Sequence, residues 1–353
     1  MIRLVWRTDV HMSDVAPSSR KDDWTDTVAG KLRQVGLVAA RVGAAAVLDG
    51  GDFFHVKSPT RNSHSLTRRV AEIHATYPCP TFGNVGNHDC VYGDYSYLDQ
   101  QPLGVLFASG VYGRCYDEHE VFFGPSGDSV RAFPFHRRNG WVDGDPFEAR
   151  GSRKDIPIVR VVGVPYHGTT YDMGRFSRIE RGAEDHLVCM AHLLASPSGG
   201  SMFEGEDIVR YADLSAFAPD VYLFGHWHKD QGVVELAGKK IVNIGSLTRG
   251  SLSQDEMARK PACAVLTFEV GKPSSVQVVR LKVAAPEDVF DVEGRVRAET
   301  RAETMEAFID SVRKRLLLEE GRSLPEVVSS MEDVPHRVRE RVLLYLERAG
   351  GGR

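Results

Sequence analysis

The fold is decided by VLDGGDFFHVKSPT at residues 47–60, together with GNVGNHDC at residues 83–90. In each stretch an apolar strand runs into a turn with polar side chains. The first turn carries Asp52, and the second carries Asn87, His88 and Asp89. In an open α/β sheet, ligands gather outside the carboxyl ends of the strands. The two turns therefore predict one shared polar site, which the rest of the chain completes.

The segments around these turns follow the order strand, helix, strand, helix, strand, which is typical of a parallel α/β sheet. The first helix is predicted by apolar residues at helical spacing, with a glycine just past its end. The expected elements are a strand at Ile2–Trp6, a helix at Trp24–Val42 ended by Gly43, a strand at Ala44–Leu48, a helix at Asn62–Ala75 and a strand at Pro80–Gly83.

The pattern weakens between Val111 and Pro157, where we expect a hairpin insertion or a long surface loop. Short strands rich in β-branched residues follow, and they predict a second sheet packed on the first. These strands are Ile158–Val164, Leu187–Met190, Val221–Phe224, Lys240–Ile244 and Ala262–Val270. Two of them run into histidines: one into His192, the other into His226 and His228 of GHWH.

The composition changes after Leu281, so we expect two domains, residues 1–285 and residues 286–353, with a hinge at Ala284–Gly294. In the second domain, apolar residues at helical spacing predict helices at Thr300–Leu318 and Pro335–Ala349. No apolar run approaches the length of a membrane span, and the N-terminus shows no secretory signal. We therefore expect a cytoplasmic protein without membrane contact.

The composition also narrows the classes of site. Apolar residues make up 42% of the chain and charged residues 26%, a balance typical of a soluble globular protein. The five cysteines form no CxxC pair, which argues against a disulfide framework and a zinc–thiolate site and predicts reduced thiols. The net charge of −4 offers no global attraction for nucleic acid, so DNA binding would require a local patch.

The polar strand ends form the ordered set DxH, GD, GNHD, His and GHxH. Oxygen and imidazole donors without thiolate suit manganese, iron, zinc or magnesium. Seven ligand-type groups are too many for one ion and suit two ions that share a carboxylate, an arrangement that serves phosphoryl displacement. We expect the first ion to be held by Asp9, His11, Asp52 and His228, and the second by Asp52, Asn87, His192 and His226.

Within this set Asp52 lies centrally in the order and is the expected bridge. His88 adjoins the ligand Asn87, so we expect it to protonate the leaving oxygen or to stabilise charge on the phosphate, with Asp89 orienting it. Each motif alone has a plainer interpretation, since DxH or GD is usually a turn or a cap, and a single histidine on a strand is usually a core residue. Five motifs in one order, each ending an apolar strand, make coincidence a poor explanation.

The ordered set resembles that of the calcineurin-like metallophosphoesterases, over roughly residues 1–281. The resemblance implies an α/β fold with four layers, αββα, followed here by a C-terminal α-helical extension. GGDFFHVKSPT further resembles the second motif of SbcD-type double-strand-break repair nucleases and their phage recombination relatives, with matches at His55, Pro59 and Thr60. KIVNIGSLTRGSLSQDE, residues 240–256, is similar to the stretch that follows GHxH in that branch.

In such nucleases the residue matching His55 helps to position DNA near the metals, and the residue matching His88 is catalytic. The resemblance implies a manganese-dependent DNA exonuclease and endonuclease, a homodimer, and an SMC-like coiled-coil ATPase partner (SbcC-type) bound by C-terminal helices. Magnesium, iron or zinc stay open as the metal. The larger relatives carry a fuller capping domain, whereas only residues 282–353 follow here, so the two C-terminal helices fit a cap, a partner site or simple self-packing equally well.

Lys57, Arg61 and Asn62 follow the GD loop and are the candidate DNA contacts. A weaker group, for which solvated surface is the commoner interpretation, consists of Arg137, Arg138, Arg150, Arg153 and Lys154. Two other functions stay open. One is the same chemistry on a small substrate, such as a cyclic nucleotide or a phosphomonoester. The other is a non-catalytic scaffold, which would be expected to have lost ligands.

Overall fold

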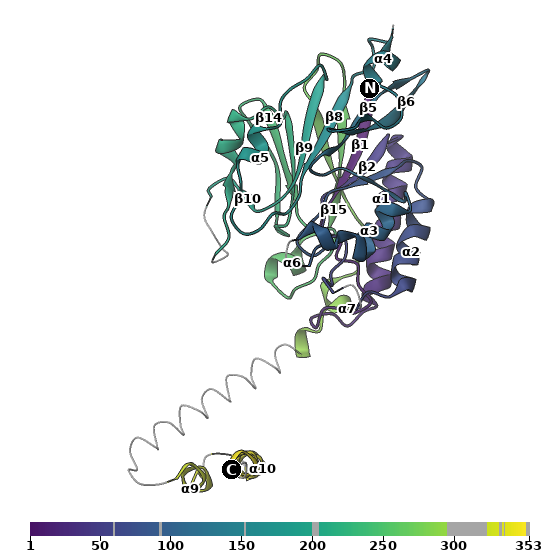
Figure 1. Ribbon diagram of the computed structural model, residues 1–353. Helices are drawn as coiled ribbons and strands as arrows, with labels where there is room; N and C mark the ends of the chain where they lie inside the picture. The colour runs from purple at the N-terminus through teal and green to yellow at the C-terminus, as the bar shows by residue number, and fades with distance from the viewer. Residues whose placement is uncertain are drawn as a thin grey trace. The chain divides into compact units, whose positions relative to one another are not determined.

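The computed structural model describes residues 1–58, 61–91, 94–151, 153–199, 205–294, 323–331, 334 and 336–350. The chain divides into two compact units, Met1–Phe290 and Asp291–Arg353. In the first unit two β-sheets pack face to face, and helices α1 (Trp24–Val42) and α2 (His64–Ala75) cover the outer side of one of them (Figure 1).

The first sheet has the strand order β16-β15-β1-β2-β3-β4. Its strands are β1 (Ile2–Arg7), β2 (Ala46–Asp49), β3 (Thr81–Gly83), β4 (Tyr112–Arg114), β15 (Ala262–Phe268) and β16 (Ser275–Arg280). Strands β1 to β4 are parallel, which confirms the predicted order of strands and helices. The expectation that Ala262–Val270 joins the second sheet is wrong, because β15 pairs antiparallel with β1, placing Phe268 opposite Ile2.

The second sheet has the strand order β13-β14-β12-β9-β8-β5-β6-β7. Its strands are β5 (His119–Ser126), β6 (Ser129–His136), β7 (Gly140–Trp141), β8 (Val159–Val164), β9 (His186–His192), β12 (Val221–Gly225), β13 (Asp230–Leu236) and β14 (Lys239–Ile244). The hairpin β5–β6 was expected as an insertion or a surface loop. Instead β5 pairs antiparallel with β8, with Val121 opposite Val161, so the hairpin is an integral part of this sheet.

Side chains of β1 alternate between two cores, as the two-residue period of a strand requires. Leu4 and Trp6 lie in the core between the sheets, whereas Val5 packs against the helices. Helix α1 has the predicted bounds, and Gly43 ends it with a left-handed φ of 61°. The outer face of the second sheet is covered by two short helical turns, α5 (Gly174–Ser177) and η3 (Tyr211–Ala216). The four-layer α/β sandwich is therefore confirmed, with unequal outer layers.

Several short elements connect these layers. They are η2 (Tyr95–Gln100), α3 (Pro102–Ala108), α4 (Pro146–Arg150), β10 (Ala195–Ser196), β11 (Val209–Arg210), α6 (Gln254–Ala258) and α7 (Pro286–Val289). After α7, the buried ring of Phe290 packs under the guanidinium groups of Arg20 and Arg249, at 4.9 and 5.6 Å. Residues 286–290 therefore belong with the first unit.

The second unit contains α9 (Leu324–Ser329) and α10 (His336–Gly350), and α10 confirms the helix predicted at Pro335–Ala349. A small apolar cluster joins them through Val328, Met331, Val334, Val342, Leu343 and Leu346. The helix predicted at Thr300–Leu318 lies outside the described residues. All five cysteines are free thiols. Among the helices that the structure describes, none is both long enough and apolar enough to cross a membrane.

Arg7, at the end of β1, is completely buried and holds the first sheet to α2. Its Nε donates to Asp49 Oδ2 at 2.8 Å, and its terminal nitrogens reach Tyr77, Tyr112 and His74. Removing one partner of a buried ion pair leaves an uncompensated charge and costs about 3–5 kcal/mol. Arg7→Met is expected to lower the free energy of unfolding in urea by about that amount.

The control for this prediction is Arg68→Met, because Arg68 forms an exposed ion pair with Glu72 one turn along α2. Exposed pairs contribute about 0–1 kcal/mol, so the control should unfold close to wild type. Equal urea midpoints for the two variants would show that the buried pair contributes no more than a surface pair.

Candidate metal centre

The seven predicted ligand residues all lie at the carboxyl ends of strands, and both sheets contribute. In the first sheet Asp9 and His11 follow β1, Asp52 follows β2, and Asn87 follows β3; in the second sheet His192 ends β9, and His226 and His228 follow β12. The strands that carry them are parallel within each sheet, so their carboxyl ends meet at one edge of the sandwich. The structure therefore brings together loops that are far apart in the sequence.

Four of these residues adopt a backbone conformation that is rare outside glycine. The φ angles of Asp9, His11, Asp52 and His226 are 52°, 51°, 52° and 87°. Such conformations cost about 1–3 kcal/mol each and concentrate at functional sites. The loops after β1 and β2 support each other, since the amides of Asp9 and His11 donate to the carbonyls of Gly51 and Asp52 at 3.1 and 3.0 Å.

Gly86 permits the close approach of the third loop. A Cβ at this position would overlap both the Asp52 carboxylate and the ring of His192. The glycine that precedes Asn87 in GNHD is therefore required by the packing of the site itself.

The first cluster consists of Asp9, His11, Asp52 and His228, whose ligand atoms all lie within 4.8 Å of one another. The Nε2 atoms of His11 and His228 are 2.9 Å apart. His228 Nε2 lies 3.6 Å from Asp9 Oδ1, and His11 Nε2 lies 3.9 Å from Asp52 Oδ2. These are the four residues predicted for the first ion.

The second cluster consists of Asp52, His192 and His226, again within 4.8 Å, and Asn87 joins it with its Oδ1 3.3 Å from His192 Nε2. Asp52 takes part in both clusters. Its Oδ1 lies 3.4 Å from His192 Nε2, whereas its Oδ2 is the oxygen nearer His11. One carboxylate oxygen thus faces each cluster, which is the placement that a bridging ligand requires.

Burial and charge set the protonation of these groups. Burial, together with the neighbouring His228, holds the pKa of His11 well below its usual value, so its imidazole is neutral and offers a lone pair. Burial alone would lower the pKa of His192, but the Asp52 carboxylate outweighs it and raises this pKa to about 9. Burial alone would raise the pKa of Asp52, but His192 and His11 hold it well below the usual range.

The donor set fits two divalent cations that share Asp52. Ligand atoms bound at about 2.0–2.2 Å to a common ion must lie within about 4.4 Å of one another, close to the spread of each cluster. All donors are carboxylate or amide oxygens and imidazole nitrogens, which suit manganese, iron, zinc or magnesium. Two imidazole nitrogens that face each other at 2.9 Å, in His11 and His228, are the arrangement expected of ligands that converge on a cation.

His55 and His88 lie beside the first cluster and form a third group with His11. His55 Nδ1 is 3.3 Å from His11 Nδ1, and the rings of His55 and His88 are stacked at 5.2 Å with an interplanar angle of 15°. The backbone amide of His88 donates to Asp52 Oδ1 at 2.7 Å. His88, predicted to be catalytic, and His55, predicted to position DNA beside it, are therefore both placed against the metal ligands.

Asp89 does not orient His88 as predicted. Its buried carboxylate accepts backbone N–H bonds from Phe53, Phe54 and Gly86, at 3.0, 3.2 and 3.0 Å. His88 Nδ1 instead lies 2.6 Å from the carbonyl oxygen of His55. Burial and the nearby Asp52 raise the pKa of Asp89 to about 8, although the backbone N–H bonds by themselves would lower this pKa. Asp89 holds the second and third loops together, and a backbone carbonyl orients His88.

The structure adds residues that the motifs did not indicate. Glu206 Oε1 lies 3.0 Å from His226 Nε2 and accepts the hydroxyl hydrogen of Tyr171 at 2.6 Å. The same hydroxyl oxygen accepts the amide of Leu194 at 2.9 Å, just after the ligand strand β9. Tyr166 places its ring 5.4 Å from that of His226. These residues come from irregular segments without a recognisable motif, and only the folded chain brings them to the site.

The predicted DNA contacts divide into two kinds. Lys57 and Arg61 are exposed beside the His55 loop. Asn62 is buried, and its Nδ2 donates to the carbonyls of Val56 and Ser58 at 2.8 and 3.2 Å. Asn62 therefore braces the loop in place of the predicted phosphate contact. Pro59 and Thr60 lie outside the described residues.

In the weaker group of predicted contacts, Arg150 and Arg153 form ion pairs with Asp185 and Asp155 at 3.2 and 3.0 Å. Arg137 and Arg138 also form ion pairs, with Glu120 and Glu118, but in addition they line a pocket between β6, β8 and α5.

Comparison with known proteins places this geometry in context. The sequence model described as calcineurin-like phosphoesterase matches residues 2–230, a range that contains all seven ligand residues, His55 and His88. No curated protein sequence matches the chain.

Similar solved structures include the protein TT1561 of Thermus thermophilus, with 12% sequence identity, coverage of 80% of this chain and 99% of that chain, and a TM-score of 0.42. A dimetal phosphatase from Danio rerio shows 11% identity, coverage of 78% and 98%, and a TM-score of 0.42. The purple acid phosphatase PPD1 from yellow lupin seeds shows 12% identity, coverage of 79% and 51%, and a TM-score of 0.40.

Proposed function

Because this chain belongs to the calcineurin-like phosphoesterase family and is thus a metal-dependent phosphoester hydrolase, we propose that it is a two-metal nuclease that cleaves phosphodiester bonds at DNA ends. The observation that carries the proposal is the third histidine group. His55 stacks on His88 and contacts the ligand His11, and the exposed Lys57 and Arg61 follow it closely in the chain. The metal ligands and His88 would serve a small phosphoester, and the additional imidazole of His55 supports a longer substrate such as a DNA strand.

When bound, two divalent cations, with manganese as the expected metal, supply Lewis-acid activation of a water and neutralise charge on the phosphate. Asp9, His11, Asp52 and His228 would hold one of them, and Asp52, Asn87, His192 and His226 the other. The chain itself places the remaining groups. The carbonyl oxygen of His55 can only accept, so His88 Nδ1 must donate to it, and Nε2 is left to exchange a proton with the leaving oxygen.

His55 is well placed to position the strand. Its ring forms a triangle with the rings of His11 and His88, with centroids 5.3 and 5.2 Å away. A phosphate or sugar held by His55 would therefore lie next to the group that protonates the leaving oxygen. Burial and the neighbouring His88 lower the pKa of His55, which favours a neutral ring able to donate one hydrogen bond to a phosphate oxygen.

The direct test incubates the full chain with Mn²⁺ and linear duplex DNA labelled at either the 5′ or the 3′ end. We expect metal-dependent release of nucleotides from the ends, with suppression by chelator. Hydrolysis of bis(p-nitrophenyl) phosphate without cleavage of any linear, nicked or single-stranded DNA would refute the nuclease and favour a small substrate.

Glu206 gives a prediction about metal affinity. Metal-ligating histidines commonly donate their second ring N–H to a carboxylate, and loss of such a partner lowers metal affinity about 10–100-fold. Glu206 contacts Nε2 of His226, which leaves Nδ1 of this ring for a cation. Glu206→Ala should therefore lower the affinity of one of the two Mn²⁺ sites about 10–100-fold, as measured by calorimetric titration.

Two matched variants separate this role from a general loss of charge. Glu206→Gln keeps an acceptor for both His226 and Tyr171 and should recover most of the affinity. Glu235→Ala removes an exposed carboxylate on β13 and should bind both ions as wild type does. Wild-type affinity at both sites in Glu206→Ala would show that the contact with His226 is not used.

We also propose that the protein forms a homodimer and that its C-terminal unit binds an SMC-like coiled-coil ATPase. Support comes from α10, where Val338 and Leu344 remain 39% and 45% exposed while Val342, Leu343 and Leu346 pack in the apolar cluster. Light scattering of the purified chain tests the dimer. A monomer at all micromolar concentrations would overturn it.

A further inference from the structure

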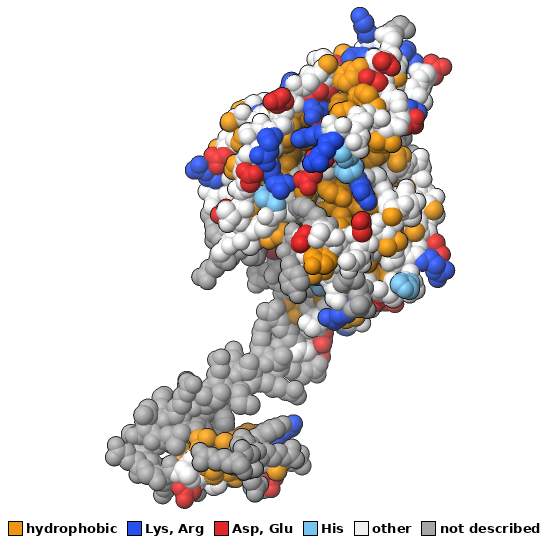
Figure 2. All heavy atoms as spheres, viewed as in Figure 1, with side chains coloured by type: hydrophobic (Ala, Val, Ile, Leu, Met, Phe, Trp, Pro, Cys, Tyr) orange, Lys and Arg blue, Asp and Glu red, His pale blue; other side chains and the backbone are white. Residues whose placement is uncertain are grey.

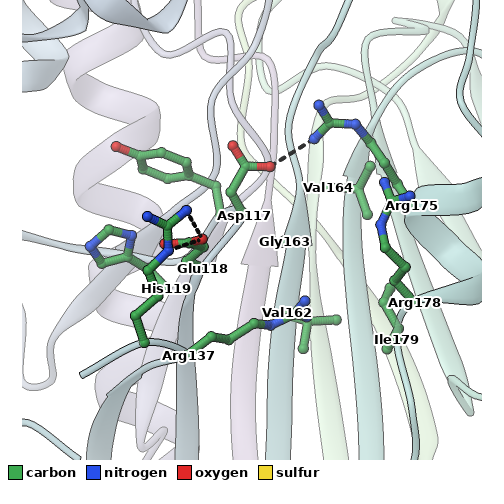
Figure 3. Close-up of a pocket in the computed structure, with 12 residues that line it drawn as sticks. Asp117, Glu118, His119, Arg137, Val162, Gly163, Val164, Arg175, Arg178 and Ile179 are labelled. Atoms are coloured by element: carbon green, nitrogen blue, oxygen red, sulfur yellow. Dashed lines mark hydrogen bonds and ion pairs between the residues drawn. The ribbon is translucent and has the colours of Figure 1, made fainter. Parts of the chain in front are cut away.

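A polar pocket with a volume of about 540 Å³ lies over strand β8 and contains none of the metal-ligand residues. Figure 3 shows Arg175 and Arg178 on one side and Arg137, Glu118 and His119 on the other, with strand β8 between them. The face seen in Figure 2 carries a group of Lys and Arg side chains with His side chains next to it, in the region where β8 and β9 run in Figure 1. A volume of this size is within the usual range of small-molecule sites.

Most of the arginines in this pocket form ion pairs with part-exposed carboxylates, and these pairs can be replaced by contacts with a ligand. Arg175 donates to Asp117 Oδ1 at 2.7 Å, and Arg138 donates to Glu118 Oε1 at 2.6 Å. Exposed or half-exposed pairs of this kind contribute about 0–1 kcal/mol, and a guanidinium has five N–H donors, so each arginine keeps donors for an incoming phosphate.

Arg137 is different, because it is anchored on the fully buried Glu120, which it shares with Arg160. This contact fixes one guanidinium in place before any ligand arrives. Arg178 pairs with the exposed Asp172 at 3.0 Å. The pocket thus combines one preorganised arginine with three others, Arg138, Arg175 and Arg178, on exchangeable pairs.

The pocket also offers surfaces for a base. His119 is half-buried, and its ring is backed by the buried ring of Tyr116, 5.7 Å away at an interplanar angle of 35°. The buried side chains of Val162, Val164 and Ile179 form the floor of the pocket. Bases of single strands bind on such aromatic and apolar surfaces while basic side chains follow the phosphates. The lining therefore adds one part-exposed ring, that of His119, to the arginines that can hold a phosphate.

The pocket is connected to the metal centre through the end of β8. Val164 lines the pocket, and two residues later the amide of Tyr166 donates to the carbonyl of Val85 at 3.0 Å, in the loop that leads to Asn87. Two residues of extended chain span about 7 Å. The ring of Tyr166 in turn lies against His226.

We propose that this pocket is a subsite that binds a phosphate and its base in the nucleic-acid strand adjoining the cleaved bond. The proposal deepens the nuclease function above and rests on it for the identity of the strand. Arg175 and Arg178 bind the phosphate, Arg137 fixes its position, and the ring of His119, backed by Tyr116, receives the base.

The test uses a fluorescent oligothymidine of 12 nucleotides. Its binding to the full chain is measured by fluorescence anisotropy, without added metal and at several salt concentrations. In the double variant Arg175→Gln with Arg178→Gln, both side chains that hold the one phosphate are lost. The slope of log affinity against log salt should fall by about 0.7, the contribution of one phosphate on a single strand, and the affinity should fall about tenfold at low salt.

Two further variants keep the test decisive. Asp117→Asn releases Arg175 from its pair and should tighten binding by up to about fivefold, a gain that a misfolded variant cannot produce. Arg181→Gln removes an arginine of the same loop that pairs with Asp220 outside the pocket, and it should bind as wild type does.

The outcomes distinguish the subsite from the nuclease. If wild type cleaves DNA but the double variant keeps its affinity and its salt slope, the subsite is overturned and the nuclease stands. Failure of wild type to bind the oligothymidine at low salt overturns the subsite whatever the chain hydrolyses. A parallel titration with 5′-dTMP shows whether the pocket prefers a nucleic-acid strand or a free nucleotide. Tighter binding of dTMP than of the oligothymidine would overturn the proposal that the ligand is a strand.

Discussion

Replacing Asp52 with asparagine is expected to remove both ions and to abolish phosphodiester turnover. Asp52 directs one carboxylate oxygen toward each ligand cluster, so a neutral amide weakens both sites at once. Charge stabilisation by bound metals is worth several kcal/mol, and each 1.36 kcal/mol is a factor of ten in rate. We therefore expect a loss of at least about 10³-fold in kcat, with neither site retaining its ion by elemental analysis.

The variant also tests the bridge itself. Loss of one ligand from a single site would leave the other ion in place, whereas loss of a bridge disturbs both. Asp128→Ala removes an exposed carboxylate at the turn between β5 and β6 and is the control, with full metal content expected. Retention of two ions at wild-type affinity in Asp52→Asn would contradict the shared position of Asp52.

Replacing His88 with glutamine is expected to separate chemistry from metal binding. His88 Nδ1 is occupied by the carbonyl of His55, and its ring lies 4.9 Å from that of the ligand His11. General acid catalysis contributes about 10²–10⁴-fold, so kcat on DNA should fall by that factor while both ions remain.

The leaving group supplies a sharper readout for His88. A p-nitrophenolate departs with little need of a proton, so His88→Gln should lose much less activity on bis(p-nitrophenyl) phosphate than on DNA. His64→Gln changes an exposed histidine at the start of α2 and should leave both activities at wild type. Equal losses on the two substrates would remove the proton-transfer role and leave only a role in binding the phosphate.

The sequence predicted the strand ends well because the information is local. An apolar run that meets Asp, Asn or His indicates where a strand stops, and parallel strands must deliver their ends to one edge. For that reason Asp9, Asp52 and His192 could be assigned to one site from their positions in the chain, and the helix ended by Gly43 could be given its bounds.

What the sequence could not supply depends on pairing between distant segments. Nothing in the residues of β15 specifies β1 as its neighbour, and the β5–β6 hairpin contains glycine and proline that made it resemble a loop. Asp89 was assigned to His88 by adjacency, yet in the fold its carboxylate faces three backbone amides. Glu206 had no motif at all, because its role arises only where an irregular segment crosses His226.

Because the two sheets share the metal ligands, binding of metal is linked to the stability of the packing between the sheets. Four ligand residues come from the first sheet and three from the second, so the sheets cannot part without dismantling the centre. A ligand present at a hundredfold excess over its dissociation constant stabilises the folded state by about 2.7 kcal/mol. When the metal is scarce, the two-sheet unit would lose this stabilisation of its folded state. It would then be more susceptible to proteolysis than the metal-bound protein.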